Sequence, residues 1–267
     1  MTARTNLRPF APTRRRGAPG GFWTAIVVFG LGTILGSIAL RALQPVLGIS
    51  PALLVLPQLG PSVGVLGVVL VCKPVAGVTG GGSWWPDVRV LRRVGCGAAV
   101  LAAVLALSVV VLAGTGRAVG PPGLGQLGVS LWFFVPLQLL GVCGEELGWR
   151  VFLQQHLQTR WPMTAAALAV GTVWAGWHVE YYRFGPLFFG AFWLACVALS
   201  VILAHLVHRT GRGALLIAGA FHCLLNLGTL VVLDFSGGEL PHMLVLAGTT
   251  GGAAVVLAPV GRVRRER

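Results

Sequence analysis

The stretch GVCGEELGWR, residues 141–150, places two carboxylates and one guanidinium inside an apolar background. A charge at the centre of a membrane helix costs about 2.5–3.5 kcal/mol, so these groups must pair or reach water. Glu146 and Arg150 are four residues apart and share a helix face, whereas Glu145 points about 100° away. We expect Arg150 to neutralise Glu146, which leaves Glu145 suited to act as a general base. The alternative is a structural ion pair beside a helix-capping Glu.

The composition around this stretch is that of a polytopic membrane protein. Of the 267 residues, 55% are hydrophobic and only 10% are charged, whereas a soluble domain carries about 25% charged residues. The net charge of +13 is spread over the segments between apolar runs, which indicates topology signals rather than a nucleic-acid-binding face. The five cysteines form no CxxC pair and are expected to be free thiols.

Eight apolar runs are long enough to span a bilayer, for which about 20 residues are needed. They cover approximately residues 22–43, 51–71, 94–113, 126–159, 162–181, 186–206, 213–233 and 240–260. We therefore predict an all-α, polytopic membrane helical bundle of about eight transmembrane helices, the fourth of them long and bent at Pro136. Most Lys and Arg residues fall in the segments that this count places inside, so both termini are expected in the cytoplasm.

The chain is predicted to have four parts and no internal repeat. They are a disordered basic arm (1–21), the first three transmembrane helices (22–125), a core with every candidate site residue (126–233), and the last transmembrane helix with a basic tail (234–267). The first apolar run is expected to be a retained anchor rather than a signal peptide, because it is long and lacks a clear A-x-A cleavage site.

Three further polar side chains lie within the predicted spans. His178 falls late in the fifth helix, and His222 and Asn226 are four residues apart on the seventh, so both project from one face. A lone buried His is more often a hydrogen-bonded core residue, so the prediction of a site depends on all three side chains together. Together with Glu145, these residues predict a water-accessible site shared by the fourth, fifth and seventh helices. Glu180 lies nearer the outer end of the fifth helix and is expected at most to support that site.

These residues resemble the motifs of the CPBP family, which comprises CAAX prenyl proteases of the Ras-converting type and bacterial proteins linked to bacteriocin processing or self-immunity (Abi proteins). The matching residues are Glu145, Glu146 and Arg150 for EExxxR, Trp174 and His178 for FxxxH, and His222 and Asn226 for HxxxN. Trp174 replaces the usual Phe, which we interpret as a packing change. The resemblance covers roughly residues 126–233.

The resemblance implies an intramembrane endopeptidase that acts on a membrane-associated peptide or protein. Glu145 would activate a water, His178, His222 and Asn226 would hold that water and stabilise the oxyanion, and the Glu146–Arg150 pair would support the site. His178, His222 and Glu145 would also suit a zinc ion with an open coordination position. HExxH is absent, however, and a metal-free arrangement is equally consistent, so the cofactor is left open.

Two other functions are compatible with the same residues. One is a non-catalytic self-immunity or scaffold protein of this fold, and the other is a proton-coupled transporter with buried Glu and His as a relay. Transporters often show two repeated halves, which this chain lacks. The Arg-, Ala- and Gly-rich composition with a single Lys indicates a GC-rich bacterium, so the expected location is the bacterial cytoplasmic membrane. The expected partners are the lipid bilayer and the substrate, with no nucleic acid and no prediction of oligomeric state.

Overall fold

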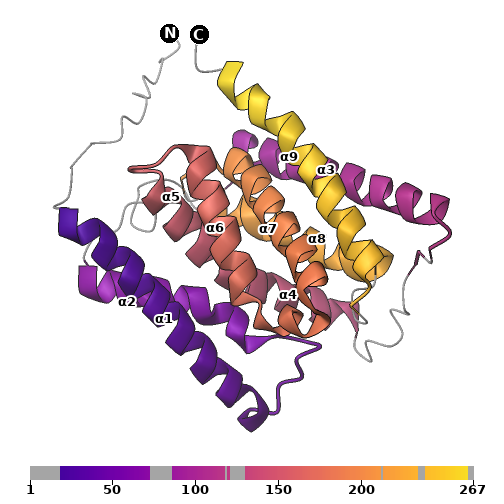
Figure 1. Cartoon of the computed structure of the whole chain (residues 1–267). Coiled ribbons are helices and arrows are strands. Elements are labelled where there is room, and N and C mark those ends of the chain that lie inside the picture. The colour runs from indigo at the N-terminus through magenta and orange to yellow at the C-terminus, as the bar shows by residue number, and fades with distance from the viewer. Residues whose placement is uncertain are drawn as a thin grey trace, which may run out of the picture.

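A computed structural model describes residues 19–72, 86–117, 119–120, 130–211, 213–233 and 238–263. All regular structure in these ranges is helical (Figure 1). Most of the predicted basic arm, the Gly-rich loop that contains Trp84 and Trp85, the start of the predicted fourth helix and the end of the basic tail lie outside the described residues.

Helical elements occupy each of the eight predicted apolar runs. The longer helices are α1 (Pro19–Val46), α2 (Gly60–Cys72), α3 (Val88–Gly114), α4 (Leu131–Glu146), α6 (Met163–Trp177), α7 (Pro186–Leu206), α8 (Gly213–Val232) and α9 (Leu240–Val263). The shorter elements are the 3₁₀ turns η1 (Leu56–Leu59) and η4 (Val179–Phe184), the π-helical segment η3 (Leu147–Leu153), and α5 (Gln154–Leu157).

Five of the described helices are long and apolar enough to cross a membrane. They are Gly21–Val46, Val88–Gly114, Pro186–Leu206, Gly213–Val232 and Leu240–Ala258, while Leu56–Cys72 and Met163–Trp177 are apolar but shorter. Helices of this length and hydropathy make the chain an integral membrane protein. The count of eight spans and the cytoplasmic position of both termini stay predictions.

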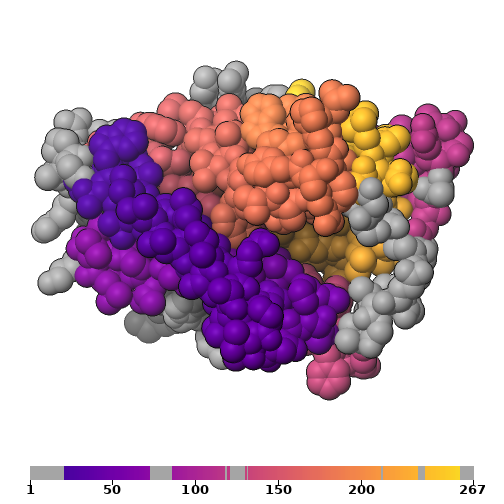
Figure 2. Space-filling view, turned by 60° about the horizontal axis from the view of Figure 1, so that its bottom comes forward, coloured from indigo at the N-terminus to yellow at the C-terminus, as the bar shows by residue number. Residues whose placement is uncertain are grey.

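Glycines set the close approach of the first two helices. A Cβ added at Gly32 of α1 would lie 2.9 Å from Cα of Gly64 on α2, and a Cβ at Gly36 would lie 2.8 Å from Cβ of Val63. Only a residue without a side chain allows the two backbones to come this close. The resulting α1–α2 hairpin lies as a unit along the helices that follow it (Figure 2).

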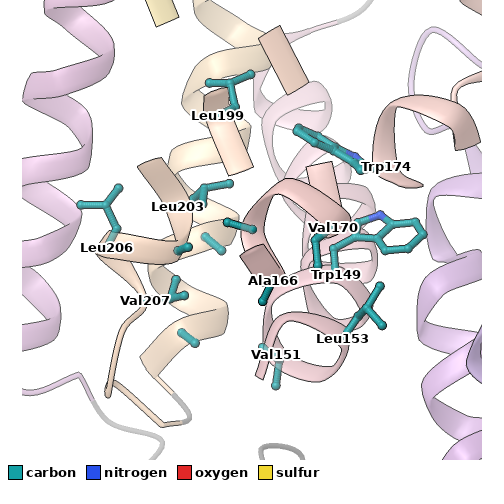
Figure 3. Close-up of a cluster of buried hydrophobic side chains, with 14 of the residues drawn as sticks. Trp149, Val151, Leu153, Ala166, Val170, Trp174, Leu199, Leu203, Leu206 and Val207 are labelled. Atoms are coloured by element: carbon teal, nitrogen blue, oxygen red, sulfur yellow. The ribbon is translucent and has the colours of Figure 1, made fainter. Parts of the chain in front are cut away.

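The largest apolar core lies between the π-helical segment and helices α6, α7 and α8. Phe152, Ala175 and Ile202 are fully buried in it. Figure 3 shows Trp149 and Trp174 at one edge of this cluster, away from Leu206 and Val207. A second cluster, with Leu112, Phe188, Leu233 and Met243, joins α3, α7, α8 and α9.

The predicted fourth helix is not a single α-helix bent at Pro136. Pro136 lies inside α4, and the helix instead widens into the π-helical segment η3 directly after Glu146. Six consecutive residues of η3, from Gly148 to Leu153, are buried, because α2, α6 and α8 surround it. Such π-helical turns are rare and are often found at functional sites.

The predicted fifth helix ends at Trp177 rather than near Tyr181. His178 leaves the helical conformation, with φ −82° and ψ 68°, and its ring Nδ1 donates to the carbonyl of Trp174 at 2.8 Å. In a continued helix that carbonyl would accept from the backbone N–H of residue 178, so the side chain replaces the backbone donor. The Tyr182 hydroxyl donates to the carbonyl of Gly176 at 2.9 Å, which satisfies a further acceptor at the helix end.

Candidate active site

A cavity of about 1130 Å³ brings the four predicted catalytic residues together. Glu145, His178, His222 and Asn226 all line it, from the end of α4, the C-cap of α6 and the middle of α8. The α1 helix forms a long wall of the same cavity, and η1 and η4 supply further lining residues. The surrounding lining is mostly apolar, so these polar side chains face a largely hydrophobic cavity.

Glu146 is the centre of a buried network of charged side chains. Arg150 Nε lies 3.3 Å from Glu146 Oε2, the pairing that their spacing predicts, and His222 Nδ1 lies 2.8 Å from Oε1. The Arg150 contact is an ion pair without good hydrogen-bond alignment, whereas the His222 contact is a hydrogen bond. Glu146 and Arg150 are 0% and 1% exposed, so each charge depends on the other for stabilisation.

Both imidazole rings are oriented by a partner at Nδ1. His222 Nδ1 bonds the Glu146 carboxylate, and His178 Nδ1 bonds the Trp174 carbonyl. The Trp174 carbonyl can only accept a hydrogen bond, and Glu146 also accepts because its pairing with Arg150 keeps it a carboxylate. Nδ1 therefore carries the hydrogen in each ring. Each Nε2 is left without a hydrogen-bond partner within the described ranges. The two rings can therefore present Nε2 to a water or a substrate atom.

Trp174 connects the two carboxylates of the site. Its indole N–H donates to Glu145 Oε2 at 3.0 Å, and the guanidinium carbon of Arg150 lies 4.3 Å from its ring centroid. The ring also meets His222 and His178 edge-on, with centroids 5.3 and 5.7 Å apart. The interpretation of this Trp as a packing change was therefore incomplete. The signal that could have found its role is that a buried indole N–H usually has a hydrogen-bond partner.

The predicted zinc set does not fit the observed arrangement. Across the described residues, no group of three or more His, Cys, Asp or Glu side chains is placed to hold a metal ion. A catalytic zinc needs three protein ligands at about 2.0–2.2 Å for nitrogen or oxygen, and Glu145 is instead held by Trp174.

Two further polar residues line the cavity and are not among the residues predicted from the sequence. Gln58, on η1, lines the cavity with a buried Oε1 that has no hydrogen-bond partner in the described part of the chain. Tyr181, on η4, packs against Phe192 with ring centroids 4.3 Å apart and ring planes tilted by 33°.

The family of this segment follows from its sequence. Residues 127–228 match the Rce1-like family of type II CAAX prenyl endopeptidases. This match confirms the resemblance that the three motifs indicate. The Rce1-like segment contains every motif residue described above, and it includes α4, η3, α6, α7 and most of α8.

Named relatives divide into two groups. CAAX prenyl protease 2 of Methanococcus maripaludis is 31% identical over 108 residues, which are 35% of this chain and 40% of that protein. Lysostaphin resistance protein A of Staphylococcus epidermidis is 24% identical over 234 residues, 85% of this chain and 60% of its own length. The Staphylococcus haemolyticus protein of that name is 23% identical over 246 residues, which are 86% of this chain and 63% of that protein. The chain thus spans less than two thirds of each of these relatives.

Proposed function

We propose that the protein is an intramembrane endopeptidase that hydrolyses a peptide bond of a membrane-associated peptide or protein, with Glu145 as the general base. The observation that carries the proposal is the shared cavity of Glu145, His178, His222 and Asn226. A carboxylate, two oriented imidazoles and an amide around one apolar cavity are the groups that water activation and oxyanion stabilisation require.

The proposed reaction uses the free atoms of these residues. Glu145 Oε1 accepts a proton from a water while its Oε2 stays bonded to Trp174, and the water oxygen attacks the scissile carbonyl carbon. The side-chain N–H₂ of Asn226 stabilises the negative oxygen that forms, and the unprotonated Nε2 atoms of the imidazoles accept hydrogen bonds from the attacking water. Glu145 then returns the proton to the leaving amine as the C–N bond breaks. Glu146 and Arg150 take no part in the bond changes and hold His222 in place.

The family match favours a lipid-modified CAAX chain end as the substrate class. We also place the protein in the bacterial cytoplasmic membrane, with eight crossings and both termini in the cytoplasm. The support for this placement is the distribution of basic residues between the apolar runs and the helices that occupy all eight runs.

The test is cleavage by purified protein in liposomes of a farnesylated CAAX peptide that carries a fluorophore and a quencher. Glu145→Gln removes the base and should lower kcat by about 10²–10⁴-fold, the usual contribution of a general base. Glu239→Gln makes the same chemical change at the start of α9, outside the cavity, and should keep the wild-type rate. A second readout compares the chain ends of membrane proteins in cells that carry the wild type or Glu145→Gln. The proposal is refuted if neither readout detects a cleavage product that depends on Glu145.

A second candidate function is a resistance protein that needs no catalysis. The observation in its favour is the broad similarity to lysostaphin resistance protein A, which covers 85% of this chain rather than the motif region alone. The Glu145→Gln protein separates the two functions, because a non-catalytic protein would keep its cellular phenotype after this substitution.

A further inference from the structure

We propose that Trp174 is a positioning residue, whose indole N–H holds Oε2 of Glu145 so that only Oε1 is free to take a proton. This inference rests on the proposed function for its catalytic consequence. The contact itself is independent of that function: Nε1 lies 3.0 Å from Oε2, and both side chains are buried, at 3% and 1% exposure. No other hydrogen bond to the Glu145 carboxylate is present among the described residues.

A second contact strengthens this hydrogen bond. The Arg150 guanidinium lies against the ring of Trp174, with its carbon 4.3 Å from the centroid, and a cation over the ring face draws electron density from the indole. The N–H that faces Glu145 is then a better donor to a carboxylate. Arg150 therefore serves both glutamates: it pairs directly with Glu146 and acts on Glu145 through Trp174.

The backbone of the same residue orients a second group of the site. The Trp174 carbonyl accepts from Nδ1 of His178 at 2.8 Å, so one residue fixes the carboxylate with its side chain and the imidazole with its main chain. Trp174, in the buried end of α6, thus sets the relative placement of Glu145 and His178. Phe at this position would keep a six-membered aromatic ring and the carbonyl, and would lose the N–H together with the five-membered ring that carries it.

The variant that removes this hydrogen bond is Trp174→Phe. Its matched control is Trp193→Phe, which removes an indole N–H bonded to the Thr172 hydroxyl at 3.3 Å, at a position outside the cavity. On the farnesylated peptide, Trp174→Phe should lower kcat by about 10- to 100-fold with KM within about twofold, because a misplaced base affects the chemical step rather than binding. Trp193→Phe should change neither constant.

The second measurement does not need activity. Free energies of unfolding are compared for wild type, Trp174→Phe, Glu145→Met and the double variant, because a coupled pair departs from additivity. The unfolding constants should depart from additivity by about 10- to 100-fold, as for a hydrogen bond to a charged group. The same cycle with Trp193→Phe should be additive.

Each outcome bears on the proposal. Coupling together with the selective loss of kcat supports it. An additive cycle overturns it, whether or not Trp174→Phe slows the reaction, because Trp174 would then not act through Glu145. Wild-type kcat for Trp174→Phe also overturns it. If the wild-type protein cleaves nothing and the cycle still shows coupling, the endopeptidase function fails while the placement of Glu145 by Trp174 stands.

Discussion

Replacement of Arg150 by Met tests whether the buried network is held together by charge. The substitution leaves Glu146 at 0% exposure with His222 as its remaining partner. Deletion of one partner of a buried ion pair costs about 3–5 kcal/mol, and loss of the cation–π contact with Trp174 adds up to about 2 kcal/mol. The expected loss is therefore about 3–7 kcal/mol, a large part of the stability of an ordinary domain.

A double variant distinguishes charge from packing. Glu146→Gln together with Arg150→Met removes both charges, so it should be less destabilised than Arg150→Met alone, because no unpaired carboxylate is left buried. The control is Arg183→Met, which removes an exposed guanidinium that lies over Phe184 and should cost at most about 1 kcal/mol.

The assay is reversible unfolding in mixed micelles, followed by tryptophan fluorescence and reported as the free energy of unfolding. The reasoning is wrong if Arg150→Met stays within about 1 kcal/mol of wild type. It is also wrong if the double variant is the less stable of the two, since packing rather than charge would then hold the segment together.

A further pair of substitutions tests the packing outside this network. Gly171→Ala should destabilise the fold by about 1–3 kcal/mol, because the added Cβ would lie 2.7 Å from the α7 backbone. Gly190→Ala, with nothing within 4 Å of the added Cβ, should be neutral or stabilising. Equal thermal stability of the two variants would contradict this reasoning.

Local spacing was sufficient to predict the charge pairing of the EExxxR segment. Glu146 and Arg150 are neighbours on any helical surface at a separation of four residues, and the pair is present even though the π-helical segment begins between them. The expectation that His178, His222 and Asn226 share one site with Glu145 followed from a different constraint, because polar groups in apolar helices are stable only where they meet one another or water; all four residues line one cavity.

The parts that could not be predicted depend on contacts between distant segments. The bond from Trp174 to Glu145 joins α6 to α4 across 29 residues, and no local pattern specifies it. The early end of α6 arises because the His178 side chain competes for a backbone carbonyl, which periodicity does not reveal. The widening of the helix after Glu146 reflects burial on all sides by α2, α6 and α8, a property of the assembled fold.

The long wall that α1 contributes has a consequence for how the protein can diverge. Thr33, Ile34 and Ile38 line the cavity from a hairpin that precedes the matched residues 127–228, whereas the four predicted catalytic residues that line it all lie within that range. One segment of the chain thus shapes a wall of the cavity, and a different segment supplies the predicted catalytic residues. Replacement of side chains on α1 can reshape the cavity while leaving the four predicted catalytic residues unchanged, so proteins that share these four residues are free to differ in the molecules that fit the cavity.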